Sequence, residues 1–234
     1  MRRCIITTTL CLIATVAGAQ TNAESGAPER PKGVQPLAVT LPELRLLGTT
    51  PVMFATLVRE GGLSGGVAVS NPSCSHGPDG SISIPAGTSF NSALGQIAKA
   101  ETASEWQVRD GIANLLPAGA APSLLLVQIR TFEWDTNAPV GEVIDRLRHL
   151  PEVSGGALEL GLKEVPFEGG MRAICIRGDC SEKPKRELAL KTEEAVSLLT
   201  VLNRVVRAHI GAVWGYSEYR CDNGTVFSLE ALAE

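Results

Sequence analysis

The chain has 234 residues, of which 44% are hydrophobic and 4% aromatic, and its formal net charge at pH 7 is −4. Its charges are mixed and form no basic tract, so binding to nucleic acid is not expected. The same balance argues against an anionic lipid surface as the partner.

The first residues have the plan of a secretory signal peptide. Arg2 and Arg3 precede a short apolar run, and the small residues 17–19 provide an A-x-A cleavage site. We therefore expect residues 1–19 to be removed by cleavage after Ala19. This leaves 19 basic residues against 25 acidic ones, a net charge of −6. No later segment is apolar for long enough to cross a bilayer, so no membrane span is expected after signal removal.

A flexible linker is predicted next, over residues 20–38. The stretch QTNAESGAPERPKGVQP is rich in proline, glycine, alanine and charge. Such a composition offers almost nothing to bury, so it is typical of a disordered spacer.

The first folded module is predicted over residues 39–120. Thr50-Pro51 begins a helix, because proline fits the first helical turn, and Gly61-Gly62 ends it. GGVAVS and SISIPA are predicted strands, separated by a loop that carries Cys74. Thr88 or Ser89 caps a second helix. SEWQVRDGIANLLP is a predicted hairpin whose turn is Asp-Gly, a pair that tolerates positive φ.

The second module is predicted over residues 121–234. LLLVQIRTFEW is a predicted strand, and Asn137 with Pro139 begins a helix that Pro151 ends. ALELGL and RELALK alternate as strands. Thr192 is the predicted cap of a longer helix, which Gly211 ends. A final hairpin turns at Asn-Gly.

The two modules follow the same order of elements. Both have a helix-opening proline, and Trp106 and Trp214 each lie early in the first strand of the last hairpin. We predict an α+β fold of two tandem small β-α-β-β-α-β-type modules, each with two helices on a small mixed sheet.

This order resembles the short N-terminal (STN-type) domain of secretins and TonB-dependent receptors. The resemblance rests on residues 82–117, ISIPAGTSFNSALGQIAKAETASEWQVRDGIANLLP, and less closely on residues 188–229, LALKTEEAVSLLTVLNRVVRAHIGAVWGYSEYRCDNGTVFSL. The motifs are apolar spacings rather than catalytic signatures, and neither a secretin channel nor a receptor barrel is expected to follow. The family's roles imply periplasmic contact with another protein and no catalysis.

The cysteines that remain after signal removal favour disulfides. Cys74, Cys175, Cys180 and Cys221 are an even set in an oxidising compartment, and four cysteines allow three connectivities. Cys175 and Cys180 are near enough to close a local loop, which would leave Cys74 with Cys221. Zinc is the competing interpretation, with His76 the only histidine near any cysteine.

The hypothesis of catalysis and the hypothesis of adhesion each depend on one predicted loop. His76 beside Asp79 is a candidate base of a secreted hydrolase-like enzyme. His149 and His209 are placed at helix C-termini, where the dipole favours a cation. Arg177, Gly178 and Asp179, between Cys175 and Cys180, match an integrin-binding tripeptide, although Gly-Asp is also turn chemistry.

The favoured hypothesis is an exported, non-enzymatic protein-interaction module of the periplasm or the extracellular space. Its partner is expected to be another envelope or secreted protein, captured by addition of a strand to an open sheet edge. No catalytic residue, cofactor or metal is assigned. The hydrolase and the adhesion protein are the alternatives.

Overall fold

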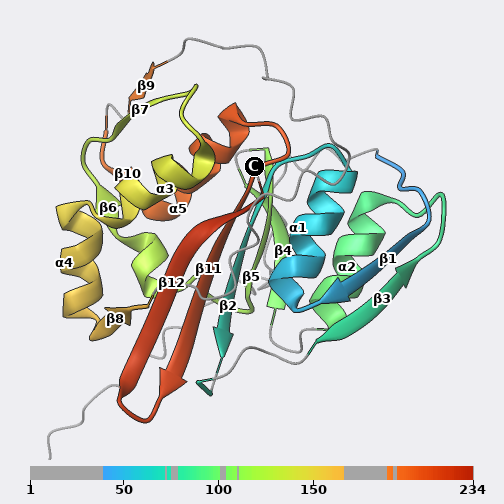
Figure 1. The fold of residues 1–234 in the computed structure, drawn as a ribbon, viewed down its shortest axis with the longest axis horizontal. Coiled ribbons are helices and arrows are strands. Elements are labelled where there is room, and N and C mark those ends of the chain that lie inside the picture. The colour runs from blue at the N-terminus through green and yellow to red at the C-terminus, as the bar shows by residue number, and fades with distance from the viewer. Residues whose placement is uncertain are drawn as a thin grey trace, which may run out of the picture. The chain divides into compact units, whose positions relative to one another are not determined.

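The computed structural model describes residues 39–71, 73–74, 79–100, 104–109, 111–165, 189–191 (backbone only) and 194–233. All of them belong to one compact unit, Gln35–Glu234. The predicted signal peptide and linker lie outside these residues. The fold is α+β, as the order of elements predicts (Figure 1).

The described residues of the first half form two helices and five strands. In chain order they are β1 (Leu44–Gly48), α1 (Thr50–Glu60), β2 (Gly65–Asn71), β3 (Gly80–Ile84), α2 (Phe90–Ala100), β4 (Ser104–Arg109) and β5 (Ile112–Pro117).

The second half has three α-helices among its described residues. Its elements are the 3₁₀ turn η1 (Ser123–Leu126), β6 (Gln128–Ile129), β7 (Glu133–Asp135), α3 (Val140–Arg148), α4 (Pro151–Glu159), β8 (Leu162–Glu164), β9 (Ala189–Lys191), β10 (Val196–Ser197), α5 (Leu198–Ala208), β11 (Val213–Cys221) and β12 (Gly224–Ala233).

A six-stranded mixed sheet runs through the middle of the unit in the order β4-β5-β2-β11-β12-β8. Its centre is the parallel pair β2 and β11, which puts Gly66 beside Trp214. The sheet therefore takes three strands from each half. The expectation that each module has a sheet of its own is corrected here, because β2 and β11 join the two three-stranded parts into one.

The pairing pattern is the same in both halves. β5 pairs with β4 antiparallel and with β2 parallel, while β12 pairs with β11 antiparallel and with β8 parallel. A separate two-stranded antiparallel sheet accompanies each half, β1 with β3 and β7 with β9.

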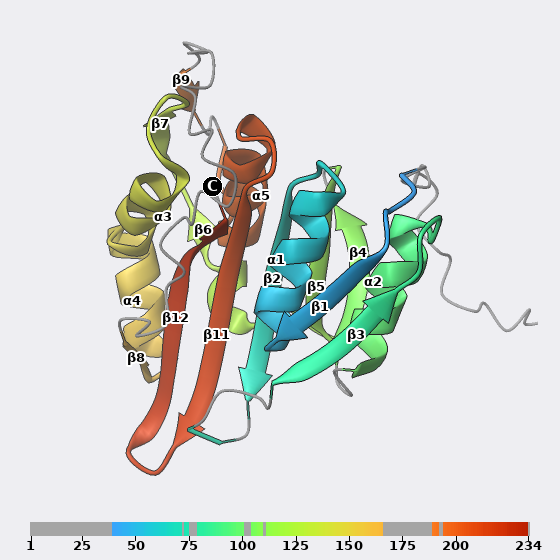
Figure 2. The same cartoon turned by 45° about the vertical axis from the view of Figure 1, so that its right-hand side comes forward.

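The central strands are covered on both faces. Val67 and Val69 of β2 belong to a first core with α1 and α2, whereas Ala68 between them belongs to a second core with α3, α4 and α5. Successive side chains of a strand point to opposite faces, so the two helical layers lie on opposite sides of the sheet. Figure 2 shows α3 and α4 on one side of β11 and β12, with α1 and α2 on the other.

The segment 124–134, predicted as one strand, is broken in the structure. Residues 123–126 form the 3₁₀ turn η1, and two short strands follow. Leu124, Leu125 and Ile129 are fully buried in the second core. The apolar run therefore reflects burial, which an irregular segment can also satisfy, and not strand pairing.

Helix α4 was not predicted, and the last three of its nine residues were expected to begin the strand ALELGL. Pro151 does follow the end of α3, but it also occupies the first turn of α4, where its missing N–H costs no hydrogen bond. Val153 and Ala157 are buried at helical spacing. The strand β8 begins only at Leu162.

Helix α5 begins later than predicted. Its N-cap is Ser197, whose hydroxyl accepts a hydrogen bond from the Thr200 N–H at 3.3 Å. The expected cap Thr192 lies outside the described residues, and Glu194 and Ala195 precede the helix. In the first half, Ser89 rather than Thr88 caps α2, because its hydroxyl accepts from the Ser92 N–H at 3.2 Å.

Candidate functional site

The outer side of strand β4 is an open edge of the central sheet. Among the described residues, no strand pairs with β4 except β5. Arg109 and Ile112 pair across only two intervening residues, so they form a hydrogen-bonded pair, and such pairs alternate along an antiparallel ladder. The backbone groups of Ser104, Trp106 and Val108 therefore point away from β5. Pro117, which has no N–H, lies opposite Ser104, in agreement with this register.

The two faces of β4 differ in character. Trp106 and Val108 are half-buried and lie on the same face as Leu115 and Ala113, which belong to the first core. Glu105 and Arg109 are on the other face and are exposed. Alternation of this kind is typical of an antiparallel strand with one solvated face, and exposed charges discourage non-specific pairing.

Trp106 packs against helix α2 at Gly95. A side-chain carbon added to Gly95 would lie 3.9 Å from Trp106 Nε1. Glycine at this position of the helix leaves room for the indole. The indole of Trp106 therefore covers the contact between α2 and the open edge of β4.

Trp214 has a corresponding position on β11, but there it is fully buried. Its Nε1 donates a hydrogen bond to Asn203 Oδ1 of α5 at 3.0 Å, and its ring lies over Gly66 of β2. A side-chain carbon on Gly66 would overlap Trp214 Cε2. The contact between β2 and β11 thus depends on a glycine beneath a tryptophan.

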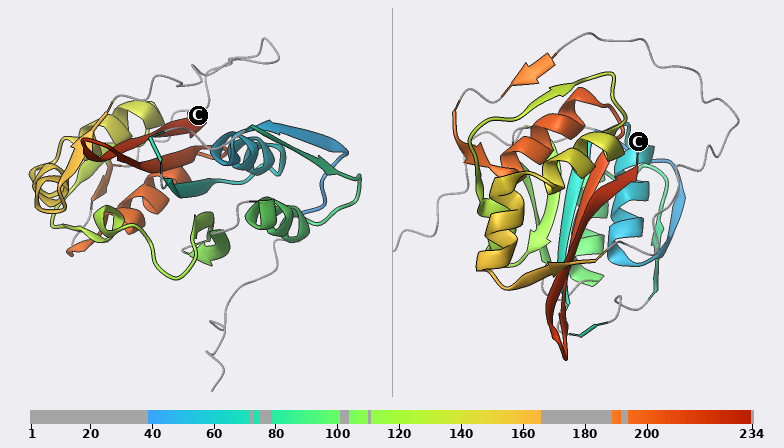
Figure 3. Two further views of the ribbon diagram at one scale, coloured as in Figure 1. Left: turned by 90° about the horizontal axis from the view of Figure 1, so that it is seen from below. Right: turned by 60° about the vertical axis from the view of Figure 1, so that its left-hand side comes forward.

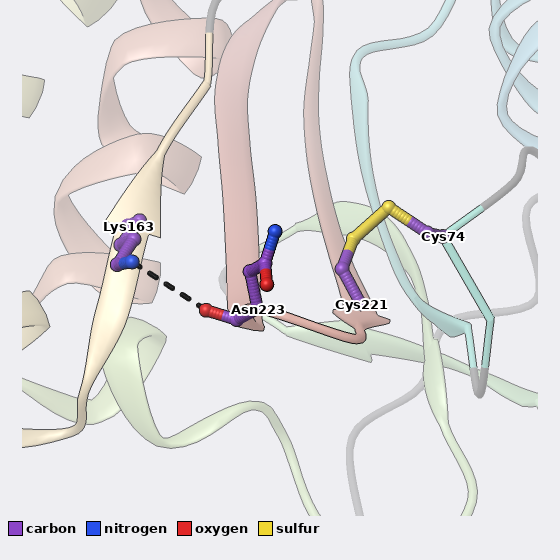
Figure 4. Close-up of a disulfide and its surroundings, with 4 residues drawn as sticks. All are labelled: Cys74, Lys163, Cys221 and Asn223. Atoms are coloured by element: carbon purple, nitrogen blue, oxygen red, sulfur yellow. Dashed lines mark hydrogen bonds between the residues drawn. A yellow bond between two sulfur atoms is a disulfide. The ribbon is translucent and has the colours of Figure 1, made fainter.

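The disulfide between Cys74 and Cys221 lies at the end of this junction (Figure 4). Cys74 follows β2, and Cys221 is the last residue of β11 before its hairpin turn. On the other side of the hairpin, Lys163 Nζ of β8 donates to the backbone oxygen of Asn223 at 3.4 Å. Figure 3 shows this long hairpin, in red, extending past its neighbours. The bridge fixes the hairpin to the segment that follows β2.

An open pocket of about 280 Å³ lies at the same end of the sheet. Glu218 is the one ionisable side chain among the residues described as lining it. Glu218 Oε2 accepts a hydrogen bond from the Tyr216 hydroxyl at 2.7 Å. Burial, and then this hydrogen bond, raise the pKa of Tyr216. Among the described lining residues, Glu218 therefore has no second ionisable side chain with which to form an acid–base pair. The pocket walls are Ser70, Pro117, Ala120, Ala121, Pro122, Ser123, Leu160, Leu162, Glu218 and Thr225.

Elsewhere on the same hairpin, the carboxyl of Glu230 has a shifted pKa. Burial of Glu230 raises the pKa of its carboxyl from 4.5 to about 7, against the opposing charge of Arg148. Arg148 is itself paired with Asp145 and, at 2.9 Å, with Glu164 Oε1 of β8. This cluster connects α3 to the far edge of the sheet.

Several candidates from the sequence lie outside the described residues. They are His76, the possible base, and the whole loop of Cys175, Arg177, Gly178, Asp179 and Cys180. The pairing of Cys175 with Cys180 therefore stays a prediction, as do the hydrolase and adhesion readings.

His149 and His209 are the C-caps of α3 and α5. His149 Nδ1 lies 2.7 Å from the Asp145 carbonyl oxygen, and its side chain is 63% exposed. Among the described residues, no three His, Cys, Asp or Glu side chains gather so that they could hold a metal ion. In the same part of the chain, the helices are too short or too polar to span a membrane.

The chain has no significant match among protein-family models, curated proteins or solved structures. The candidate site is therefore defined by its geometry. Sequence reasoning named Trp106 and Trp214 but missed Gly66 and Asn203. The available signal for Gly66 was the Gly-Gly pair that opens the strand GGVAVS, since glycine inside a strand often marks a close approach.

Proposed function

We propose that this chain is an exported, non-enzymatic protein-interaction module that binds another envelope or secreted protein by strand addition at the β4 edge. The observation that carries the proposal is the open edge itself. The backbone groups of Ser104, Trp106 and Val108 face outward beside a half-buried tryptophan. An extended segment of a partner gains main-chain hydrogen bonds there, and side-chain pockets give it specificity.

Two divergent copies of an STN-type domain make up the chain in this proposal. Support comes from the strand pairing, which has the same order and the same directions in both halves. A family role in periplasmic protein contact agrees with an interaction module.

The periplasm or the extracellular space is the proposed location. The disulfide between Cys74 and Cys221 is compatible with export, because disulfides persist in oxidising compartments. The signal peptide expected over residues 1–19 provides the route.

Replacement of Val108 by proline tests the proposal. Proline lacks the outward N–H and blocks a further strand, while the ladder to β5 stays intact because Val108 does not donate to it. Val108→Thr is the matched control, since it keeps the N–H and suits a strand. The mature chain is immobilised, and proteins captured from an envelope extract of the source organism are identified by mass spectrometry.

We expect the parent and Val108→Thr to retain the same partner. The amount captured by Val108→Pro should be lower by about tenfold or more. Circular dichroism must show the same fold for the three proteins. If Val108→Pro captures the same partner as well as the parent does, strand addition at β4 is rejected.

A further inference from the structure

The contact between β2 and β11 indicates which kind of strand can pair with the open edge of β4. We propose that β4 receives a parallel strand with a glycine opposite Trp106, in the way that β11 receives β2 with Gly66 opposite Trp214. This inference rests on the proposed function and specifies the chemistry of the partner segment.

The first step is that β4 and β11 are corresponding strands. Each begins a hairpin that follows a helix of 11 residues, α2 or α5. Trp106 follows Gly95 at the same spacing at which Trp214 follows Asn203. In both cases the indole nitrogen lies against that helix residue. The indole nitrogens of the two tryptophans therefore lie at corresponding positions of their helices.

The second step concerns the backbone. Cys221 and Gly224 flank a two-residue turn, so alternation along the ladder directs the backbone groups of Trp214 away from β12 and toward β2. The same alternation directs the backbone groups of Trp106 away from β5. The edge that β2 occupies on β11 is thus the edge that is open on β4.

The third step is the side-chain constraint. β2 lies parallel to β11 and pairs Gly66 with Trp214, and a larger residue at that point would overlap the indole. Because the indole nitrogen of Trp106 also lies at the corresponding helix residue, we expect a strand added to β4 to meet the indole at the corresponding register. Glycine at that position, followed by small and β-branched residues as in Val67-Ala68-Val69, fits the requirement.

The β8 edge of a second copy of this chain does not meet this requirement. The other open edge of the described sheet is β8, which has only three residues and contains no glycine. Glu164, its last residue, is ion-paired with Arg148. The occupant is therefore an extended segment of another protein, of the type small-Gly-β-branched.

The test uses a synthetic peptide with the sequence of residues 64–71, SGGVAVSN, because this segment already fills the corresponding edge of β11. A matched peptide carries valine at the position of Gly66. Both are titrated to about 1 mM against the mature chain, a concentration that detects weak binding. The readout is the indole N–H signal of Trp106 in NMR spectra, assigned with Trp106→Phe.

The glycine peptide is expected to shift the Trp106 signal and to bind at least about tenfold more tightly than the valine peptide. A nitroxide at its N-terminal end should broaden the Ser104 amide, and one at its C-terminal end the Arg109 amide, as a parallel strand requires. Val108→Pro should abolish all these effects.

Equal binding of the two peptides, an antiparallel labelling pattern, or no shift at all overturns the inference. The inference is also overturned if the chain associates with itself and Val108→Pro abolishes that association, because the occupant would then be a second copy. The capture experiment with Val108→Pro tests the proposed function separately. Strand addition at β4 can therefore be upheld even if the partner strand needs no glycine opposite Trp106.

Discussion

Two carboxyl groups on the β11–β12 hairpin differ in what surrounds them. Glu218 accepts the Tyr216 hydroxyl in the open pocket, whereas burial of Glu230 raises the pKa of its carboxyl to about 7. Both are glutamates inside a strand of the predicted hairpin, and the sequence does not show which other elements contact each of them. Their environments depend on which elements pack over each face.

Glu230 makes stability depend on pH. Its native pKa of about 7 exceeds the ordinary value of 4.5, so the native state holds this proton more tightly than the unfolded state does. The stabilisation is complete below about pH 4.5 and is lost as the pH rises through about 7. Glu230→Gln cannot lose a proton. We expect the melting temperature of this variant, relative to the parent, to rise between pH 4.5 and pH 8.

Melting curves of both proteins, recorded at intervals of pH, check this expectation. The difference between the two melting temperatures should level off above pH 8. A difference that is the same at every pH would show that Glu230 titrates alike in the folded and unfolded chains.

Asn203 illustrates why one buried polar residue was missed. It lies in the apolar stripe of α5, between Leu202 and Val205, and is fully buried. Helical periodicity places it toward the core, but only the tertiary structure shows that it accepts a hydrogen bond from Trp214. A buried acceptor of this kind is satisfied by a residue from another element.

At the scale of elements, local signals located α1, α2, α3 and the two hairpins. Proline at the first turn, an apolar stripe and a closing glycine are local features, and so are the short turns of the hairpins. Residues 124–126 and 157–159 were wrongly assigned to strands, because their apolar residues do not fix a period. Pro151 both follows one helix and starts the next.

The β2–β11 junction depends on the absence of a side chain at Gly66. We expect Gly66→Ala to lower the free energy of unfolding by about 1–3 kcal/mol, because the indole of Trp214 must shift within a packed core. Urea unfolding followed by circular dichroism measures the change.

Gly155→Ala is the matched control, since Gly155 lies in α4 with no atom within 4 Å of an added side-chain carbon. That variant should be neutral or slightly more stable, because alanine favours a helix. Equal destabilisation by both substitutions would contradict the junction described here.

At the scale of the whole molecule, one disulfide joins segments from the two halves. Cys74 and Cys221 are separated by 147 residues, so the bridge constrains the unfolded chain over a long loop. We expect Cys74→Ser combined with Cys221→Ser to reduce the free energy of unfolding by about 2–5 kcal/mol. The midpoint of urea unfolding under non-reducing conditions checks this value.

Cys175→Ser with Cys180→Ser is the control pair. A bridge between these two would close only a short loop, so its removal should have the smaller effect. If the two double variants lose the same stability, the long-range bridge contributes less than its loop length implies.

The sequence by itself determined the α+β class, most of the helices and both hairpins, and it pointed to the two tryptophans. Those features follow from neighbours a few residues apart. Only the tertiary structure decided that β2 and β11 join the two halves in one sheet, that Gly66 lies beneath Trp214, and that β4 is left open. The physical reason is that these central strands are buried on both faces, which removes the alternation that would reveal their partners.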